Sequence, residues 1–176
     1  FDNARYTAKM LVFSMDHALV IAALARCRDR QLDVQIVFSQ DMLGQTADMR
    51  SSLAFLHGRG CKIKVSQCRQ HIKAYAADLG VRETDSNESL LTGSWNCTHS
   101  AMRNWEVLTQ TSYMPGGVES ADPLGAFYAY FREIWKAKTT RWWSPDASSS
   151  RKEDSDQEQA PASGVVQKAK SSELQS

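Results

Sequence analysis

Short apolar runs alternate with segments of helical spacing in the N-terminal part of the chain, and this alternation limits the possible folds. Residues 9–14, 33–38 and 61–65 are apolar or rich in β-branched side chains, which is typical of buried strands. Between them, residues 16–28 and 47–57 place apolar side chains at helical intervals. Because this order favours parallel strands joined by crossover helices, we expect an α/β fold with a mixed, largely parallel β-sheet flanked by helices.

A second group of strands is predicted further along the chain. Residues 71–77, 89–92 and 105–111 are predicted as strands, and the polar residues 80–88 as the turn between the first two. Asp16 stands just ahead of the first helical segment, and we expect its side chain to cap that helix.

A last helix and a polar tail complete the predicted organisation. The helix begins at Asp122 or Pro123 and runs to about residue 138. Residues 144–176 contain almost no large apolar side chain, so burial cannot offset the entropy lost on ordering them. We therefore expect one folded domain over residues 1–143 and a disordered, low-complexity tail over residues 144–176.

Composition restricts the partners only weakly. The chain has 21 Lys and Arg against 20 Asp and Glu, a net charge of +1, so binding to nucleic acid or to an anionic membrane would need a local patch. Phe1 opens the chain, which agrees with a fragment or a processed product, and the apolar run 19–25 is too short to span a bilayer. We expect reduced, partly buried thiols at the four cysteines, because their spacing suits neither a C-x-x-C pair nor zinc: Cys27, Cys61, Cys68 and Cys97.

One stretch combines groups suited to phosphate chemistry. Residues 71–78 read HIKAYAAD, an H-x-K-x4-D pattern. On a strand, His71 and Lys73 would project from the same face and bring an imidazole and an ammonium group into one site. Gly93-Ser94-Trp95-Asn96 and then Asn104-Trp105-Glu106 follow, and the three motifs together are far more specific than the first alone.

These motifs resemble the signature of the phospholipase D superfamily, in which H-x-K-x4-D is followed by G-S-x-N. The resemblance covers most of residues 8–140 and includes the segment LLTGSWNCTHSAMRNWEVLTQT. In layout the chain is similar to members with a single motif, which include small bacterial endonucleases and the mitochondrial cardiolipin hydrolase (Zucchini) group. The wording LLTGSWNCT favours the second group. The departures, Ile72 and the small residues of AYAA, concern shape and access more than the reacting groups.

The resemblance implies roles for most of the motif residues. A neutral imidazole is a competent nucleophile near neutral pH, and His71 would attack phosphorus to form a phosphohistidine. Glu106 would accept the other N–H of that imidazole and so fix its orientation. Lys73, Ser94 and Asn96 would hold the phosphoryl oxygens on which negative charge develops.

The resemblance also implies what the chain lacks. Asp78 belongs to the signature, but we expect it to orient loops and backbone more than to transfer protons. No metal or cofactor is required. A second histidine must protonate the leaving oxygen, so the other half of the site would come from a homodimer or from a second H-x-K-x4-D motif elsewhere.

Three functions remain open at this stage. The first is hydrolysis of phospholipids such as cardiolipin or other phosphatidyl lipids, with membrane association. The second is endonuclease cleavage of single-stranded nucleic acid by the same chemistry, and the third is a non-catalytic phosphate-binding or dimerisation module. A basic cluster near the motif would attract any phosphodiester and does not separate lipid from nucleic acid: Lys62, Lys64, Arg69 and Lys73. The compartment is also open, and an intracellular, mitochondrial or membrane-associated protein agrees with the resemblance.

Other candidate residues have simpler interpretations. His17, His57 and His99 are interpreted as surface or capping residues, although His99 is near enough to the motif to reach a pocket. Trp142 and Trp143 would pack the last helix onto the domain or serve as an interfacial anchor. The chain contains neither G-x-S-x-G nor a Gly-rich phosphate loop, so serine hydrolase and kinase chemistry find no support.

Overall fold

The computed structural model describes residues 1–42, 47–68, 71–81, 88–112 and 122–148. Its strands are β1 (Thr7–Val12), β2 (Asp33–Ser39), β3 (Lys62–Ser66), β4 (Ala74–Ala77), β5 (Ser89–Gly93), β6 (Leu108–Ser112) and β7 (Thr140–Trp142). Its α-helices are α1 (Ala18–Asp29), α2 (Ala47–Gly58) and α3 (Pro123–Lys136). Three short 3-10 helices are η1 (Gln40–Met42), η2 (Ala101–Arg103) and η3 (Pro145–Ser148).

The strands form one seven-stranded sheet in the order β6-β5-β4-β1-β2-β3-β7. The predicted α/β class and mixed sheet are confirmed, but the expectation of a largely parallel sheet was wrong. Only β1–β2 and β2–β3 are parallel, whereas β1–β4, β4–β5, β5–β6 and β3–β7 are antiparallel. The physical reason is that α1 and α2 are the crossover helices that parallel neighbours need, whereas the described residues between β3 and β6 include no α-helix.

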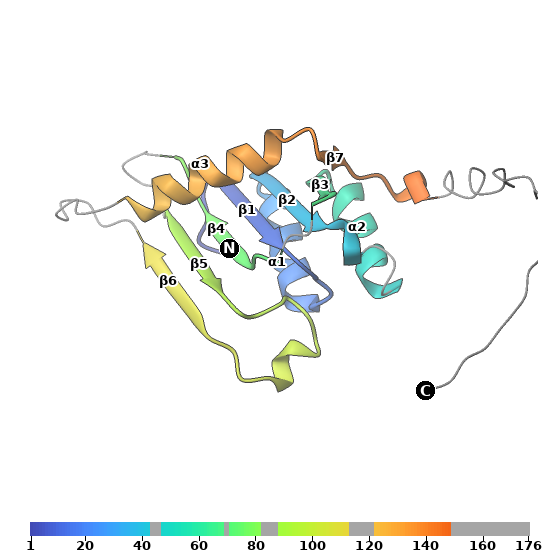
Figure 1. Ribbon diagram of the computed structural model, residues 1–176, viewed down its shortest axis with the longest axis horizontal. Coiled ribbons are helices and arrows are strands. Elements are labelled where there is room, and N and C mark those ends of the chain that lie inside the picture. Colours follow the sequence, from blue (N-terminus) through green and yellow to red (C-terminus); the bar gives the residue numbers. More distant parts are fainter. Residues whose placement is uncertain (43–46, 69–70, 82–87, 113–121, 149–176) are drawn as a thin grey trace, which may run out of the picture.

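Helices cover both faces of the sheet (Figure 1). The helices α1 and α2 pack on one face, where the buried core includes Leu24, Leu53 and Ile36. The helix α3 crosses the other face, where Phe131 packs with Leu11 and other apolar side chains of β1, β2, β4 and β5. The side chains of each strand alternate between these two cores.

Several predicted boundaries shift in the structure. The N-cap of α1 is His17 and not Asp16, whose carboxylate instead accepts a hydrogen bond from the His99 backbone N–H at 2.8 Å. The start of α3 agrees with the prediction, because Asp122 caps the helix through the Gly125 N–H at 2.8 Å. Residues 105–107 precede β6 instead of forming part of it.

The end of the described chain forms a strand that the sequence did not predict. β7 pairs antiparallel with β3, and Trp143 is buried against Phe38 with ring centroids 6.5 Å apart. Trp142 is exposed on the sheet edge, so of the tryptophan pair Trp143 alone packs into the core. Residues 145–148, which were predicted as part of the disordered tail, form the 3-10 helix η3. Residues 149–176 of that tail and residues 82–87 of the predicted turn lie outside the described residues.

Two further findings concern the whole of the described chain. Cys27, Cys61 and Cys97 are buried free thiols, and Cys68 is an exposed one. Within the described ranges, no helix has the length and apolar character needed to cross a membrane.

Candidate phosphodiester site

The H-x-K part of the first motif lies at the carboxyl end of β1. β4 runs antiparallel to β1 with Ala74 opposite Leu11, so the residues just before β4 lie beside those just after β1. His71 and Lys73 are thus in the segment that leads into β4 and not within the strand itself. The backbone N–H of Gly93 donates to the Lys73 carbonyl at 3.3 Å, which ties this segment to the end of β5.

The ammonium group of Lys73 and the imidazole of His71 are in direct contact. Lys73 Nζ lies 3.0 Å from both Nδ1 and Nε2 of His71, and it donates to the His71 carbonyl at 2.9 Å. Phe13, which follows β1, packs against both groups, with its ring centroid 4.9 Å from that of His71 and 5.5 Å from Lys73 Nζ. Sequence reasoning missed Phe13, because it fell within the strand predicted over residues 9–14, whereas β1 ends at Val12.

The side chains of His71 and Lys73 differ in burial. His71 is exposed, whereas Lys73 is only 5% exposed. Burial lowers the pKa of the Lys73 ammonium group, and the negative charge of Glu106 partly offsets this effect. Lys73 is therefore a partly desolvated cation next to an accessible imidazole, an arrangement suited to an anionic group that arrives from solvent.

Ser94, Asn104 and Glu106 form a second group across the β5–β6 connection. The Ser94 hydroxyl donates to the Glu106 carboxylate and accepts a hydrogen bond from the Val107 N–H at 3.1 Å. Asn104 Nδ2 donates to Glu106 Oε1 at 3.5 Å. The described residues contain no hydrogen bond between Glu106 and His71, so the predicted contact between this carboxylate and the imidazole is not formed. The negative charge of Glu106 instead raises the pKa of Lys73.

The G-S-x-N segment is anchored to the start of α1. The backbone N–H groups of Asp16 and His17 both donate to the Cys97 carbonyl at 2.8 Å. Asn96 Oδ1 is buried and has no hydrogen-bond partner within the described part of the chain. His17 and His99 are close to this segment, with ring centroids 4.9 Å apart.

Asp78 lies at the opposite end of β4 from the His71–Lys73 pair. It is fully buried and has a left-handed backbone with φ of 53°. Its carboxylate accepts hydrogen bonds from the backbone N–H groups of Arg5, Tyr6 and Thr7 at 2.8–3.1 Å. Asp78 thus fixes the chain entering β1, and of the six predicted site residues it is the one placed apart from the others.

The predicted basic cluster does not gather at the motif. Lys62 and Lys64 are in β3, which β1 and β2 separate from β4. Lys62 pairs with Asp33 at 2.8 Å, and Lys64 Nζ donates to the Trp135 carbonyl at 2.7 Å. Arg69 lies outside the described residues. The expectation that these lysines line the approach to Lys73 was wrong because β3 follows a crossover to the far side of β2.

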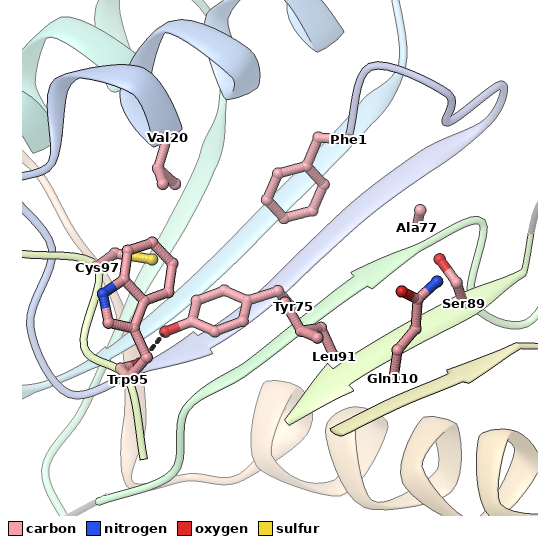
Figure 2. Close-up of a pocket in the computed structure, with 9 residues that line it drawn as sticks. All are labelled: Phe1, Val20, Tyr75, Ala77, Ser89, Leu91, Trp95, Cys97 and Gln110. Carbon is pink, nitrogen blue, oxygen red and sulfur yellow. Dashed lines mark hydrogen bonds between the residues drawn. The ribbon is translucent and has the colours of Figure 1, made fainter. Parts of the chain in front are cut away.

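A cavity of about 280 Å³ lies next to the G-S-x-N segment, on the face of the sheet that carries α1 (Figure 2). Tyr75 and Trp95 form the end near the motif, where the Tyr75 hydroxyl donates to the Trp95 carbonyl at 2.5 Å. Ser89 and Gln110 lie together at the other end. Burial raises the pKa of the Tyr75 phenol and raises that of Cys97, also in the wall, to about 12, so both side chains are neutral near pH 7.

Exposed apolar side chains neighbour the second group in the sequence. Trp105 and Val107 flank Glu106, and both are strongly exposed. Met102 and Leu108, which are close to them in the sequence, are also exposed. We name these four residues the apolar rim. Among the described residues, no cluster of three or more His, Cys, Asp or Glu side chains is arranged to hold a metal ion.

The fold is similar to that of several solved structures. The phospholipase D family member Nuc from Salmonella typhimurium is 20% identical, with a TM-score of 0.66 over 81% of this chain and 84% of that one. NucT from Helicobacter pylori is 14% identical, with a TM-score of 0.60 over 81% and 85% of the two chains. Polyphosphate kinase from Porphyromonas gingivalis is 13% identical, with a TM-score of 0.55 over 74% of this chain and 21% of that one.

A family assignment goes further than the shared fold. The family model described as "Cardiolipin synthase, PLD-like domain" matches residues 1–121, well over half of the chain. The chain therefore belongs to this family of the phospholipase D superfamily, whose members are phosphodiesterases. No curated protein matches it.

Proposed function

We propose that the chain hydrolyses phosphodiesters through a covalent bond between His71 and phosphorus. The observation that carries this proposal is the 3.0 Å separation between Lys73 Nζ and the ring nitrogens of an exposed imidazole. At that separation, one phosphoryl group can meet the nucleophile and the cation together. A lone structural histidine on the surface would not need a buried ammonium group beside it.

The reaction has two displacements. The lone pair of an unprotonated His71 nitrogen attacks phosphorus, and the bond from phosphorus to the leaving oxygen breaks. A second histidine protonates that oxygen, which departs as an alcohol. Water then attacks the phosphohistidine and gives a proton to the second histidine, the P–N bond breaks, and a phosphomonoester and the free imidazole are released.

Lys73, Ser94 and Asn96 are the groups proposed to stabilise the developing negative charge. Lys73 is already desolvated, so its interaction with a phosphoryl oxygen is stronger than that of a lysine in water. Glu106 holds the Ser94 hydroxyl and, through its charge, keeps Lys73 more readily protonated. In this proposal Glu106 is a positioning residue, because its hydrogen bonds are to Ser94 and Asn104 and not to the nucleophile.

A second copy of the same residues completes the proposed site. The His71–Lys73 pair supplies one histidine, whereas the reaction uses two. A homodimer with an isologous interface would place a second pair opposite the first, and a second motif on another chain segment would serve equally.

We further propose that the substrates are phospholipids, such as cardiolipin or other phosphatidyl lipids. The apolar rim supports this, because fully exposed Trp105 and its neighbours suit contact with an acyl chain or a lipid interface. The neutral cavity beside Trp95 offers room for an apolar part of such a substrate. The lysines of β3 are engaged away from the motif, which removes the main support for a basic groove that would bind a nucleic-acid strand.

A paired assay tests both parts of the proposal. Purified protein would be given cardiolipin vesicles, phosphatidylcholine vesicles and single-stranded DNA, each in the presence of EDTA, alongside His71→Asn and the matched control His57→Asn. We expect lipid cleavage that His71→Asn abolishes and His57→Asn retains. Cleavage of DNA alone would replace the lipid by a nucleic-acid substrate, persistent cleavage by His71→Asn would remove the nucleophile, and no cleavage by any form would favour the non-catalytic module.

The apolar rim has its own test. Trp105→Ser should raise the KM for vesicles about tenfold while leaving cleavage of a soluble diester, bis(4-nitrophenyl) phosphate, nearly unchanged. Trp142→Ser is the matched control, because Trp142 is an exposed tryptophan at the far edge of the sheet. Equal loss on vesicles and soluble diester, or equal loss in both variants, would contradict a lipid-contacting role for the rim.

A further inference from the structure

A second cavity, of about 290 Å³, lies between the sheet and α3. β1 and β2 form its floor, the residues that follow β4 form one side, and α3 forms its cover. It is on the opposite face of the sheet from the cavity beside the motif, and at the end of β4 that carries Asp78. The proposed reaction makes no use of it.

A buried ammonium group lines this second cavity. Lys9 is only 5% exposed, and it donates one hydrogen bond, to the Leu79 carbonyl at 3.2 Å. Its Nζ also lies 5.7 Å from the centroid of the Tyr128 ring. An ammonium group has three N–H donors, so in the described structure Lys9 retains donor capacity on the cavity side.

The neighbouring side chain on the same strand face is also incompletely bonded. Thr7 is two residues before Lys9 and lines the same cavity. Its Oγ1 is buried and has no hydrogen-bond partner within the described residues. Buried polar groups are nearly always hydrogen-bonded, so two such groups facing one cavity indicate a polar ligand.

The cover of the cavity adds further positive charge. Tyr128, Arg132 and Lys136 recur every four residues along α3, which places them on one face of the helix, and all three line the cavity. The described chain contains no ion pair for Arg132 or Lys136. The guanidinium of Arg132 lies 5.7 Å from the Tyr128 ring centroid.

The carboxylates near Lys9 are already engaged. Asp33 pairs with Lys62 at 2.8 Å and accepts from Gln35 Nε2 at 2.7 Å. Asp78 accepts backbone hydrogen bonds at the start of β1, and Glu88 accepts one from the Gly80 N–H at 2.8 Å. Among the described residues, Asp33 is the one carboxylate that lines the cavity, and because it pairs with Lys62, the three cations Lys9, Arg132 and Lys136 leave an excess of positive charge there.

We infer that this cavity binds a small phosphomonoester with an aromatic or apolar group. A phosphomonoester is close to a dianion at neutral pH and has three peripheral oxygens, which match the donors of Lys9, Arg132 and Lys136. The rings of Phe131 and Trp135 complete the wall and suit the organic part of such a ligand. This site is separate from the phosphodiester site and does not depend on the proposed reaction.

Binding at this site should depend on pH. Burial lowers the pKa of Lys9 to about 8, so a bound anion would draw a proton onto Lys9 when the pH is near or above that value. Affinity should therefore fall as the pH rises from 7 to 9.5. The charged and titratable groups around Lys9 include Asp33, Lys62, Asp78, Glu88, Tyr128, Arg132 and Lys136.

The test is a titration with phenyl phosphate, followed by NMR through the indole N–H of Trp135. The His71→Asn variant is used as background so that the motif contributes little binding. We expect a saturable shift of the Trp135 signal, with Kd increased about tenfold by Lys9→Met and by the double change Arg132→Gln with Lys136→Gln. Arg26→Gln, on α1 at the other face of the sheet, is the matched control and should leave Kd unchanged.

Other ligands and outcomes complete the test. Inorganic phosphate should bind more weakly than phenyl phosphate because it leaves the aromatic wall unfilled, and benzoate more weakly because it carries one charge. The exposed positions Arg132 and Lys136 keep the inference testable if Lys9→Met does not fold. It would be overturned by a Trp135 signal that does not shift, or by a Kd that is the same in the control and in the Arg132 and Lys136 double variant.

Discussion

Lys73 Nζ lies 3.0 Å from both ring nitrogens of His71 and 2.9 Å from the carbonyl oxygen of the same residue. Either ring nitrogen is within hydrogen-bonding distance of the ammonium group, and the tautomer of the imidazole decides which of them accepts. Because Lys73 is buried and His71 exposed, the cation is fixed and the reactive ring is accessible.

Removing the Lys73 charge should abolish most of the activity without unfolding the domain. In Lys73→Met, we expect kcat for phosphodiester cleavage to fall about 100- to 1000-fold, because a preorganised cation at the phosphoryl oxygens is lost. Steady-state kinetics would measure this, with circular dichroism to confirm folding. Lys62→Met is the matched control, since Lys62 pairs with Asp33 on β3, and an equal loss there would contradict a specific role for Lys73.

The alkaline side of the pH profile should report on Lys73. Its pKa is lowered from the ordinary value of 10.5 by burial, and the protonated form is the one that stabilises negative charge. Activity should therefore decline as the pH rises through this lowered pKa, before an ordinary lysine would lose its proton. Lys73→Arg stays protonated throughout that range and should lose the alkaline decline even if its kcat is lower. An unchanged decline in Lys73→Arg would assign it to another group.

Glu106→Gln separates a positioning role from direct contact with the nucleophile. The charge of Glu106 raises the pKa of Lys73, in opposition to burial, so its removal should move the alkaline decline to lower pH. The amide oxygen of Gln can still accept from Ser94, so kcat near neutral pH should change less than in Ser94→Ala. Kinetics from pH 6 to 10 would measure both effects. A loss in Glu106→Gln as large as in His71→Asn, with no shift in the profile, would favour the predicted contact with the imidazole.

The sequence predicted the fold where local patterns decide it. β2 and α2 and the start of α3 follow from β-branched runs, helical spacing and the Asp122 cap, which are properties of neighbouring residues. The short edge strand β7 was missed because it depends on pairing with β3, far away in the chain. The same limit applies to the parallel or antiparallel direction of the strands after β3.

The candidate site also has features that local spacing predicts and features that it does not. The spacing of His71 and Lys73 predicted their contact, although they lie before β4 and not in it. The hydrogen-bond partner of Glu106 could not be read from spacing, because it is set by how the β5–β6 connection folds back over Ser94. The second cavity could not be predicted from the sequence either, because Lys9 and Arg132 are brought together only by packing of α3 on the sheet.

Asp78→Asn should weaken folding more than catalysis. The side chain keeps its shape, and Asn tolerates the left-handed φ of 53° at this position, so the change isolates the charge that accepts three backbone N–H bonds. We expect the free energy of unfolding to fall by about 2 kcal/mol, from the loss of charge-assisted hydrogen bonds. Urea unfolding would measure the loss, with kcat of the folded fraction nearly unchanged. A fall in kcat without a loss of stability would instead give Asp78 a part in the reaction.

Lys9 should make the stability of the domain rise with pH above neutrality. Its pKa is about 8 in the folded protein and about 10.5 when unfolded, because burial disfavours the charged form. Between these values the unfolded chain binds more protons, so the free energy of unfolding increases with pH. From pH 7 to 9.5 this contribution amounts to about 2 kcal/mol.

Lys9→Met removes the titrating group while keeping most of its apolar length, so the rise in the free energy of unfolding from pH 7 to 9.5 should be smaller in the variant by that amount. Urea unfolding of both proteins at the two pH values cancels the titrations they share. An identical pH dependence in the two proteins would show that the Lys9 ammonium group is solvated, which would also weaken the case for a buried anion site beneath α3.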